Sequence, residues 1–62
     1  MNKLKAIRQS NNIKQKQMAK LLGISPSNYL KKESGIVKFS LNEAKKISEY
    51  FNMPIEDIFF SN

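Results

Sequence analysis

The chain has 62 residues, with 11 basic residues against five acidic ones and a formal net charge of +6. A chain of this length is expected to fold as one domain, residues 1–62, around a small core. It contains no cysteine and no histidine, which excludes disulfides and thiolate metal sites and removes the commonest general base. We therefore expect no enzyme, no metal and no cofactor. No apolar run approaches the length of a membrane span and no signal peptide is recognisable, so we expect a protein of the reducing cytoplasm with no membrane partner.

The charge is distributed unevenly along the chain. Residues 1–38 hold nine basic residues against Glu33 alone, a net charge of +8. Residues 39–62 hold two lysines against four acidic residues, a net charge of −2. Charge alone is equally consistent with a lysine-rich solubilising surface. The positive charge of residues 1–38 nevertheless suits this part of the chain to face a polyanion.

The first predicted helix spans residues 3–10, with Asn2 as its N-cap. The pair Asn11-Asn12 ends it, because asparagine tolerates a left-handed backbone. The second predicted helix spans residues 15–22, and Gly23 supplies the left-handed turn that follows. Helical spacing predicts the inward-facing residues of these two helices: Leu4, Ile7, Met18, Ala19 and Leu22.

Ser25 and Pro26 start the third predicted helix, residues 26–34, as its N-cap and first helical residue, and Gly35 ends it. The sequence S-L-N-E, residues 40–43, predicts a capping box at the start of a fourth helix over residues 41–51. That helix is predicted to bury three residues and to end at Asn52: Ala44, Ile47 and Phe51. Pro54 opens a short final helix that ends at Phe59 or Phe60. The chain is therefore predicted to be all-α.

The third helix is predicted to be polar on its outer face. With Tyr29 placed inward and about 100° between residues, Glu33 lies near the inner side, whereas Ser27, Lys31 and Ser34 point outward. An isolated helix with such a face is more often an ordinary solvated one. Here the helix follows a short helix and a tight turn, which is the layout of a helix-turn-helix motif, whose second helix enters the major groove of DNA.

Two kinds of DNA contact follow from this layout. Residues that can reach base edges are Pro26 with a thymine methyl group, Ser27 with any base, Asn28 with adenine and Lys31 with guanine. Residues predicted to contact phosphates are Lys14, Gln15 and Lys16 at the N-terminus of the second helix, Lys32 in the last turn of the third, and Lys38 just beyond it.

Residues 4–59 resemble the Cro and phage-repressor (XRE-type) helix-turn-helix family. The resemblance is carried by I-K-Q-K-Q-M-A-K-L-L-G-I-S, then E-S-G, then S-L-N-E-A-K-K-I-S-E-Y-F-N-M-P-I-E-D-I-F. It implies a compact five-helix, lambda-repressor-like domain with the motif formed by the second and third helices. It also implies an ion pair between Arg8 and Glu33, a phosphate contact by Gln15, and base contacts at the positions of the third helix named above. For Arg8, a direct phosphate contact is the alternative.

Three residues depart from the family pattern. Lys32 stands where the family usually has an apolar or aromatic core residue, so its stem is expected to cover the core while its ammonium reaches solvent or a DNA phosphate. Lys14 replaces the usual threonine or serine cap, which weakens the start of the second helix and adds a positive charge. Leu30 lies on a flank that is often small or polar, and a thymine-methyl contact or plain exposure both remain open.

The resemblance also implies a two-fold dimer on a palindromic DNA site. The residues available for the dimer interface are Met53, Ile55, Phe59 and Phe60. The alternative is that Phe59 lies in the core and Phe60 frays; we favour a weak dimer that tightens on DNA. We therefore predict a homodimeric, sequence-specific regulator of transcription that binds double-stranded DNA, a repressor of a bacterial or phage-like element. The alternative is a protein-interaction module, antitoxin-like or a regulatory subunit, whose partner protein covers the helix-turn-helix surface. A membrane-surface binder fits poorly, because the lysines are not confined to one helix face.

Overall fold

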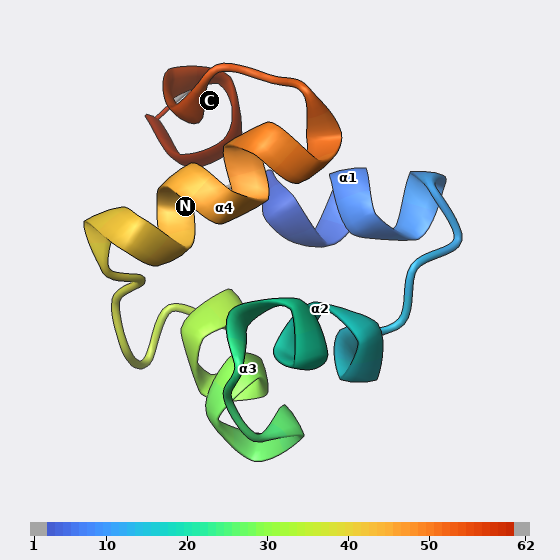
Figure 1. Cartoon of the computed structure of the whole chain (residues 1–62), viewed down its shortest axis with the longest axis vertical. Coiled ribbons are helices and arrows are strands. Elements are labelled where there is room, and N and C mark those ends of the chain that lie inside the picture. Colours follow the sequence, from blue (N-terminus) through green and yellow to red (C-terminus); the bar gives the residue numbers. More distant parts are fainter. Residues whose placement is uncertain (1–2, 61–62) are drawn as a thin grey trace.

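The computed structural model describes residues 3–60, which form five helical segments and no strand. These are α1 (Leu4–Ser10), α2 (Gln15–Leu22), α3 (Pro26–Glu33), α4 (Leu41–Phe51) and η1 (Glu56–Phe60). Figure 1 shows α2 and α3 together on one side of the molecule, with α1, α4 and η1 on the other. The predicted all-α, five-helix architecture is confirmed, and the last segment is a single π-helical turn.

Serine caps start α3 and α4 as the sequence predicted. The Ser25 hydroxyl accepts a hydrogen bond from the backbone N–H of Asn28 at 3.1 Å. The Ser40 hydroxyl accepts one from the Glu43 N–H at 3.1 Å, while Glu43 Oε1 accepts one from the Ser40 N–H at 2.8 Å. This reciprocal pair is a complete capping box, which satisfies two N–H groups that the helix itself leaves unpaired.

The starts of α1 and α2 are less well capped. A lysine side chain has no hydrogen-bond acceptor, so Lys14 before α2 contributes only its backbone N–H, which donates to Gln17 Oε1 at 2.7 Å. This is half of a capping box. Lys3 precedes α1 without a side-chain cap, and the predicted cap Asn2 lies outside the described residues.

Each of the four α-helices in the described part of the chain ends in a Schellman motif. The left-handed residues are Asn12, Gly23, Gly35 and Asn52, with φ between 54° and 90°. The residue after each donates its N–H to a carbonyl five residues back, at 2.9–3.1 Å, which satisfies one of the carbonyls at the helix end. Three of these following residues, Ile13, Ile24 and Met53, pack against the core, whereas Ile36 is 76% exposed. The predicted helix ends are thereby confirmed.

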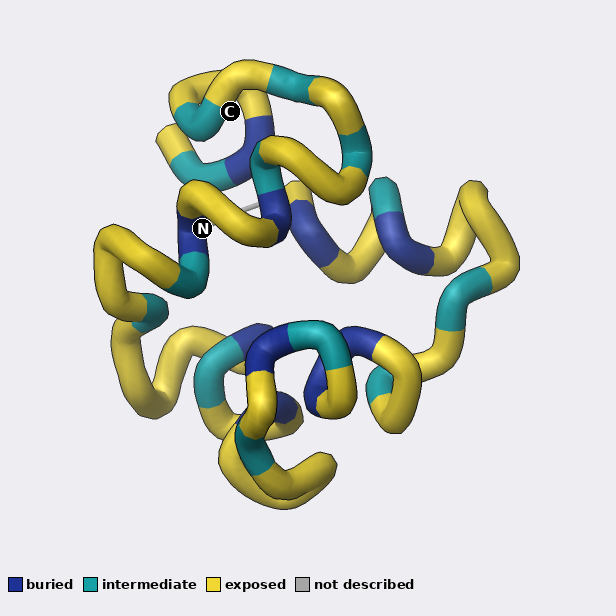
Figure 2. Tube along the Cα trace, in the orientation of Figure 1, coloured by how far each residue is buried: buried dark blue, intermediate teal, exposed yellow. Residues whose placement is uncertain are grey.

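The core lies between the two sides of the molecule (Figure 2). The fully buried side chains come from every helix and include Leu4, Met18, Tyr29, Ile47 and Ile58. Ala19 is 1% exposed, as expected for a small residue on the face of α2 that packs against α3. Of the predicted inward-facing residues, Ile7 and Phe51 are only half-buried. Three aromatic rings connect α3 to η1. The ring centroid of Phe39, in the connection after α3, lies 6.0 Å from that of Tyr29 in α3 and 5.5 Å from that of Phe59 in η1.

Candidate nucleic-acid interface

Helix α3 has one buried side and one exposed side. Tyr29 is fully buried and Glu33 is buried beside it, where α3 packs against α2. Pro26, Ser27, Asn28 and Lys31 are all exposed. The helical spacing predicted the inward side of Tyr29 and Glu33 and the outward side of Ser27 and Lys31. The structure therefore brings the four predicted base-contacting residues onto the free surface of one helix, next to α2.

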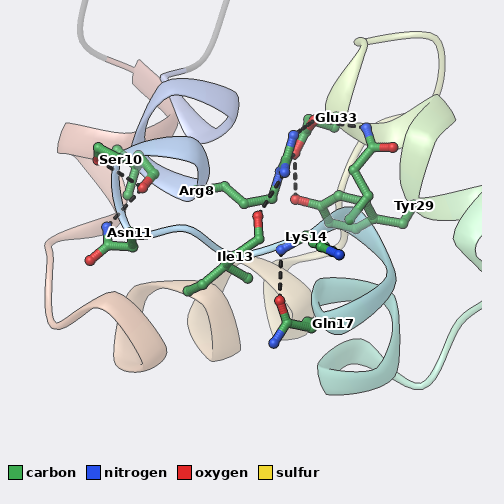
Figure 3. Close-up of polar contacts among 10 residues, drawn as sticks. Arg8, Ser10, Asn11, Ile13, Lys14, Gln17, Tyr29 and Glu33 are labelled. Carbon is green, nitrogen blue, oxygen red and sulfur yellow. Dashed lines mark hydrogen bonds and ion pairs between the residues drawn. The ribbon is translucent and has the colours of Figure 1, made fainter.

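The buried side of α3 carries a hydrogen-bond network centred on the Glu33 carboxylate (Figure 3). Arg8 reaches it from α1 in a forked arrangement, with Nε to Oε2 at 2.8 Å and Nη2 to Oε1 at 3.1 Å. The Tyr29 hydroxyl donates to Oε2 at 2.7 Å, and Gln15 Nε2 donates to Oε1 at 3.0 Å. The ion pair implied by the family resemblance is present. Since Glu33 binds residues of α1, α2 and α3, it fixes all three helices relative to one another.

The Arg8 side chain is buried, and all three guanidinium nitrogens donate hydrogen bonds within the protein. Its side chain is 9% exposed, and its remaining guanidinium nitrogen Nη1 donates to the Ile13 carbonyl oxygen at 2.7 Å, in the loop between α1 and α2. A guanidinium that is buried and bonded in this way has little surface to offer a DNA phosphate. The structure favours the ion pair over the alternative of a direct phosphate contact.

The network shifts the pKa values of its members. Burial by itself would raise the pKa of Glu33, but the hydrogen bonds from Arg8, Tyr29 and Gln15 outweigh it and hold the pKa below its usual value. Burial, reinforced by the neighbouring carboxylate, raises the pKa of the Tyr29 hydroxyl, which stays protonated and acts as a donor. The hydrogen bond to Glu33 raises the pKa of Arg8. The carboxylate is thus ionised and fully engaged at neutral pH.

Lys32 has a different partner from the one expected. Its ammonium lies 2.6 Å and 2.7 Å from the two carboxylate oxygens of Glu43 at the start of α4, and the side chains are 18% and 14% exposed. Its stem is half-buried, as the sequence suggested, but the charge is used inside the domain to hold α3 to α4. We therefore leave Lys32 out of the phosphate-contacting set.

The other predicted phosphate ligands lie at the surface. Lys14 and Lys16 at the start of α2, and Lys38 in the connection after α3, are exposed. Gln15 is half-buried because its amide nitrogen donates to Glu33. An amide nitrogen carries two hydrogens, so this contact leaves a second donor on Gln15.

An apolar groove of about 520 Å³ lies between the connection after α3, the start of α4 and η1. Its apolar lining is Val37, Phe39, Leu41, Ala44, Ile55, Phe59 and Phe60, with Lys32 and Lys38 among the remaining lining residues. Three of the four predicted dimer residues therefore border one groove. The fourth, Met53, instead packs against the core. Phe59 is half-buried against Phe39, whereas Phe60 is 75% exposed.

Sequence reasoning did not find every residue of these surfaces. Leu41, which is 72% exposed, and Val37 were not proposed for an interface, although both are apolar: Leu41 is the first residue of the predicted fourth helix, and Val37 lies in the connection before it. The contacts of Tyr29 and Gln15 with Glu33 were also missed. For Tyr29 the signal was present, because residues four apart lie on one side of a helix.

The sequence comparisons agree with this geometry. The family model described as helix-turn-helix matches residues 4–58 of the chain. The chain belongs to this family. Its members are DNA-binding regulators of transcription and not enzymes, and its XRE-type character is the one that the motifs indicated. The chain is also 43% identical over 58 residues to an uncharacterized HTH-type transcriptional regulator of Methanocaldococcus jannaschii, a match that covers 94% of this chain and 88% of that protein. None of the helices in residues 3–60 has the length and apolar character needed to cross a membrane.

Proposed function

We propose that this member of the helix-turn-helix family is a sequence-specific repressor that binds a short palindromic operator as a homodimer. It would act in the cytoplasm of a bacterial or phage-infected cell, with α3 in the major groove of double-stranded DNA. The observation that carries the proposal is the exposed polar face of α3, held opposite the buried Tyr29 and Glu33 and next to α2. The membership of the chain in a family of DNA-binding regulators supports it.

The exposed residues of α3 have the chemistry of base recognition. Lys31 is a donor suited to guanine O6 and N7, and the Asn28 amide pairs with the N6 and N7 groups of adenine. Ser27 is short enough to bring the helix backbone close to a base, and Pro26 offers an apolar surface. The hydroxyl that caps the α3 N-terminus comes from Ser25, so the Ser27 and Asn28 side chains are not used for the cap.

The start of α2 and the connection after α3 would contact phosphates. Lys14 and Lys16 are exposed on either side of Gln15. The Gln15 amide uses one hydrogen on Glu33, and its second hydrogen would be donated to a phosphate oxygen. The backbone N–H groups at the start of α2 add a partial positive charge. Lys38 supplies a cation beyond α3. Such contacts would set the position of α3 on the duplex without reading its sequence.

The apolar groove is the proposed dimer interface. Ile55, Phe59 and Phe60 were predicted for this role, and the groove adds Val37 and Leu41. Apolar side chains as exposed as Leu41 and Phe60 gain most from being covered by a second copy. A two-fold dimer would place two α3 helices about one turn of DNA apart, roughly 34 Å.

Selection of binding sites from a random duplex library at about 0.15 M salt, where non-specific binding is already weakened, tests the proposal. An enriched inverted repeat is the expected result. A single enriched half-site would retain DNA recognition and remove the dimer. Loss of transcription from a promoter carrying the selected site, on expression of the protein, would then establish repression; increased transcription would overturn it.

The phosphate contacts have a separate test. With the selected site, Lys16→Ala or Lys38→Ala is expected to lower the slope of log affinity against log salt by about one unit each, because one counterion fewer is released. Lys45→Ala on α4 is the matched control, an exposed lysine outside the proposed interface, and should leave the slope unchanged. Equal slopes for all three variants would contradict the assignment.

A second candidate function is a protein-interaction module, antitoxin-like or a regulatory subunit. The apolar groove and the exposed Phe60 favour it, because both would also suit a protein partner. A stoichiometric partner that co-purifies with the chain and covers α3, together with no enriched DNA site, would favour this function over the first.

A further inference from the structure

Leu30 is a large apolar residue on the exposed part of the proposed DNA-reading helix. It is 51% exposed, and among the described residues it belongs neither to the core cluster nor to the apolar groove. A single exposed leucine is common on protein surfaces. The position of Leu30 on α3, rather than its exposure, is what gives it significance.

The backbone of α3 is regularly helical around Leu30, so the directions of its side chains follow from their spacing. The Tyr29 N–H donates to the Ser25 carbonyl at 2.9 Å, and the Ser34 N–H donates to the Leu30 carbonyl at 3.0 Å. Turning about 100° per residue from the buried Tyr29, the exposed side chains follow one another around the helix in the order Pro26, Leu30, Ser27, Lys31, Asn28.

The outer face of α3 is therefore divided lengthwise. One edge is apolar and consists of Pro26 and Leu30, which are four residues apart and neighbours on the helix surface. The opposite edge is polar and consists of Lys31 and Asn28, with Ser27 between the two edges. A helix lying in the major groove would meet different base pairs with its two edges.

The major groove offers one apolar group, the C5-methyl of thymine, among hydrogen-bond donors and acceptors. We infer that Leu30, together with Pro26, packs on thymine C5-methyl groups and makes Leu30 a specificity-determining residue of this domain. One side of each half-site would then be selected by apolar contact and the other side by hydrogen bonds. This inference rests on the proposed DNA-binding function and goes beyond the base-contacting residues assigned there.

The experiment combines site selection with removal of a methyl group. Sites are selected with the parent protein and with Leu30→Ala, and Leu30→Ala is expected to lose the preference for thymine at one position of the half-site. That thymine is then replaced by uracil, which differs only by the missing C5-methyl. The parent should bind the uracil site about four-fold more weakly, which corresponds to the about 0.8 kcal/mol gained by burying one methyl-sized group. Leu30→Ala should bind the two sites equally.

Two controls make the result specific. Ile36→Ala removes an apolar side chain that is 76% exposed but lies after α3, and it should keep both the thymine preference and the four-fold effect of uracil. Thermal unfolding followed by circular dichroism should show that Leu30→Ala folds, since alanine is favourable in an exposed helical position.

Several outcomes would overturn the inference. One is equal binding of the thymine and uracil sites by the parent, and another is selection of the same site by Leu30→Ala. A third is that Leu30→Ala and the change of thymine to uracil weaken binding additively, which would place Leu30 in a protein contact. If the parent selects no site at all, both the proposed function and this inference are wrong. A selected site without any effect of the methyl group overturns the inference alone.

Discussion

Where α1, α2 and α3 meet, the interior contains an ion pair, with Arg8 in a forked contact with Glu33 and Tyr29 donating to the same carboxylate. Around α4 and η1 the interior is apolar and includes Ile47, Ile58 and the contact between Phe39 and Phe59. Apolar burial is non-directional and tolerates small rearrangements, whereas a network of hydrogen bonds holds its members in one geometry. The helix that is proposed to read DNA is therefore held by directional hydrogen bonds in addition to the burial of Tyr29.

The largest expected effect comes from removing the centre of the network. Glu33→Ala leaves the Arg8 guanidinium buried without its carboxylate, which is expected to cost about 3–5 kcal/mol of unfolding free energy. A domain of this size has about 3–9 kcal/mol in total, so most of its stability should be lost. Urea unfolding followed by circular dichroism measures this. Glu49→Ala, at an exposed position of α4, is the control and should change stability by less than about 0.5 kcal/mol. A similar loss in both variants would remove the contrast between the two regions.

The opposite side of the same helix should behave differently. Lys31→Ala is expected to weaken binding of the selected site by about 1–3 kcal/mol and to relax the preference at one base position. Its unfolding free energy should stay near that of the parent, because the side chain is exposed. Titration of the selected site and of a series of single-base variants gives the specificity, and urea unfolding gives the stability. Uniform weakening on every sequence would show that Lys31 contacts a phosphate.

Lowering the pH is expected to reduce the stability that the Glu33 network provides. The pKa of Glu33 is lower in the folded chain than its usual value of 4.5, so the unfolded chain takes up a proton at a higher pH than the folded chain does. This stabilisation is complete above about pH 4.5 and is lost as the pH falls toward the folded pKa, at a slope of about 1.4 kcal/mol per pH unit for one proton. The pKa of Glu43 is also lowered, so it contributes in the same direction. Urea unfolding at a series of pH values should show a smaller acid dependence in Glu33→Gln than in the parent, and an identical dependence would contradict this account.

The smallest effect is expected at the contact between α3 and α4. Glu43→Gln keeps an oxygen that can accept the Ser40 N–H but removes the charge that faces Lys32. Because both side chains retain some exposure, the loss should be no more than about 1 kcal/mol and should decrease with added salt. A loss as large as that of Glu33→Ala would mean that this ion pair, and not the Glu33 network, sets the orientation of α3.

The sequence predicted the helices well because their determinants are local. The apolar periodicity that turns Leu22 and Ile47 inward, each within its own helix, depends on residues a few positions apart, and so does the capping box at Ser40. The structure confirms both. The final helix is the weakest prediction, because Pro54 and a short apolar segment do not distinguish an α-helix from the π-helical turn at Glu56–Phe60.

The buried contacts were only partly predictable. The Arg8 and Glu33 pair joins residues 25 positions apart and was implied by family resemblance, since no local pattern indicates it. The Lys32 and Glu43 pair depends on how α3 meets α4, and periodicity gives the inward side of each helix but not which polar atoms come together. The groove likewise depends on how η1 lies against the start of α4.

The division of α3 into a buried side with Tyr29 and Glu33 and an outer side with Ser27 and Lys31 has a consequence for how such proteins diverge. In the proposed DNA-bound state, changes on the outer side would alter the target without disturbing the interior, since none of those side chains takes part in the Glu33 network. A duplicated gene would then acquire a new operator through a few substitutions while its product keeps folding. The same separation allows the outer residues of α3 to be exchanged as a cassette when a regulator is redirected by design.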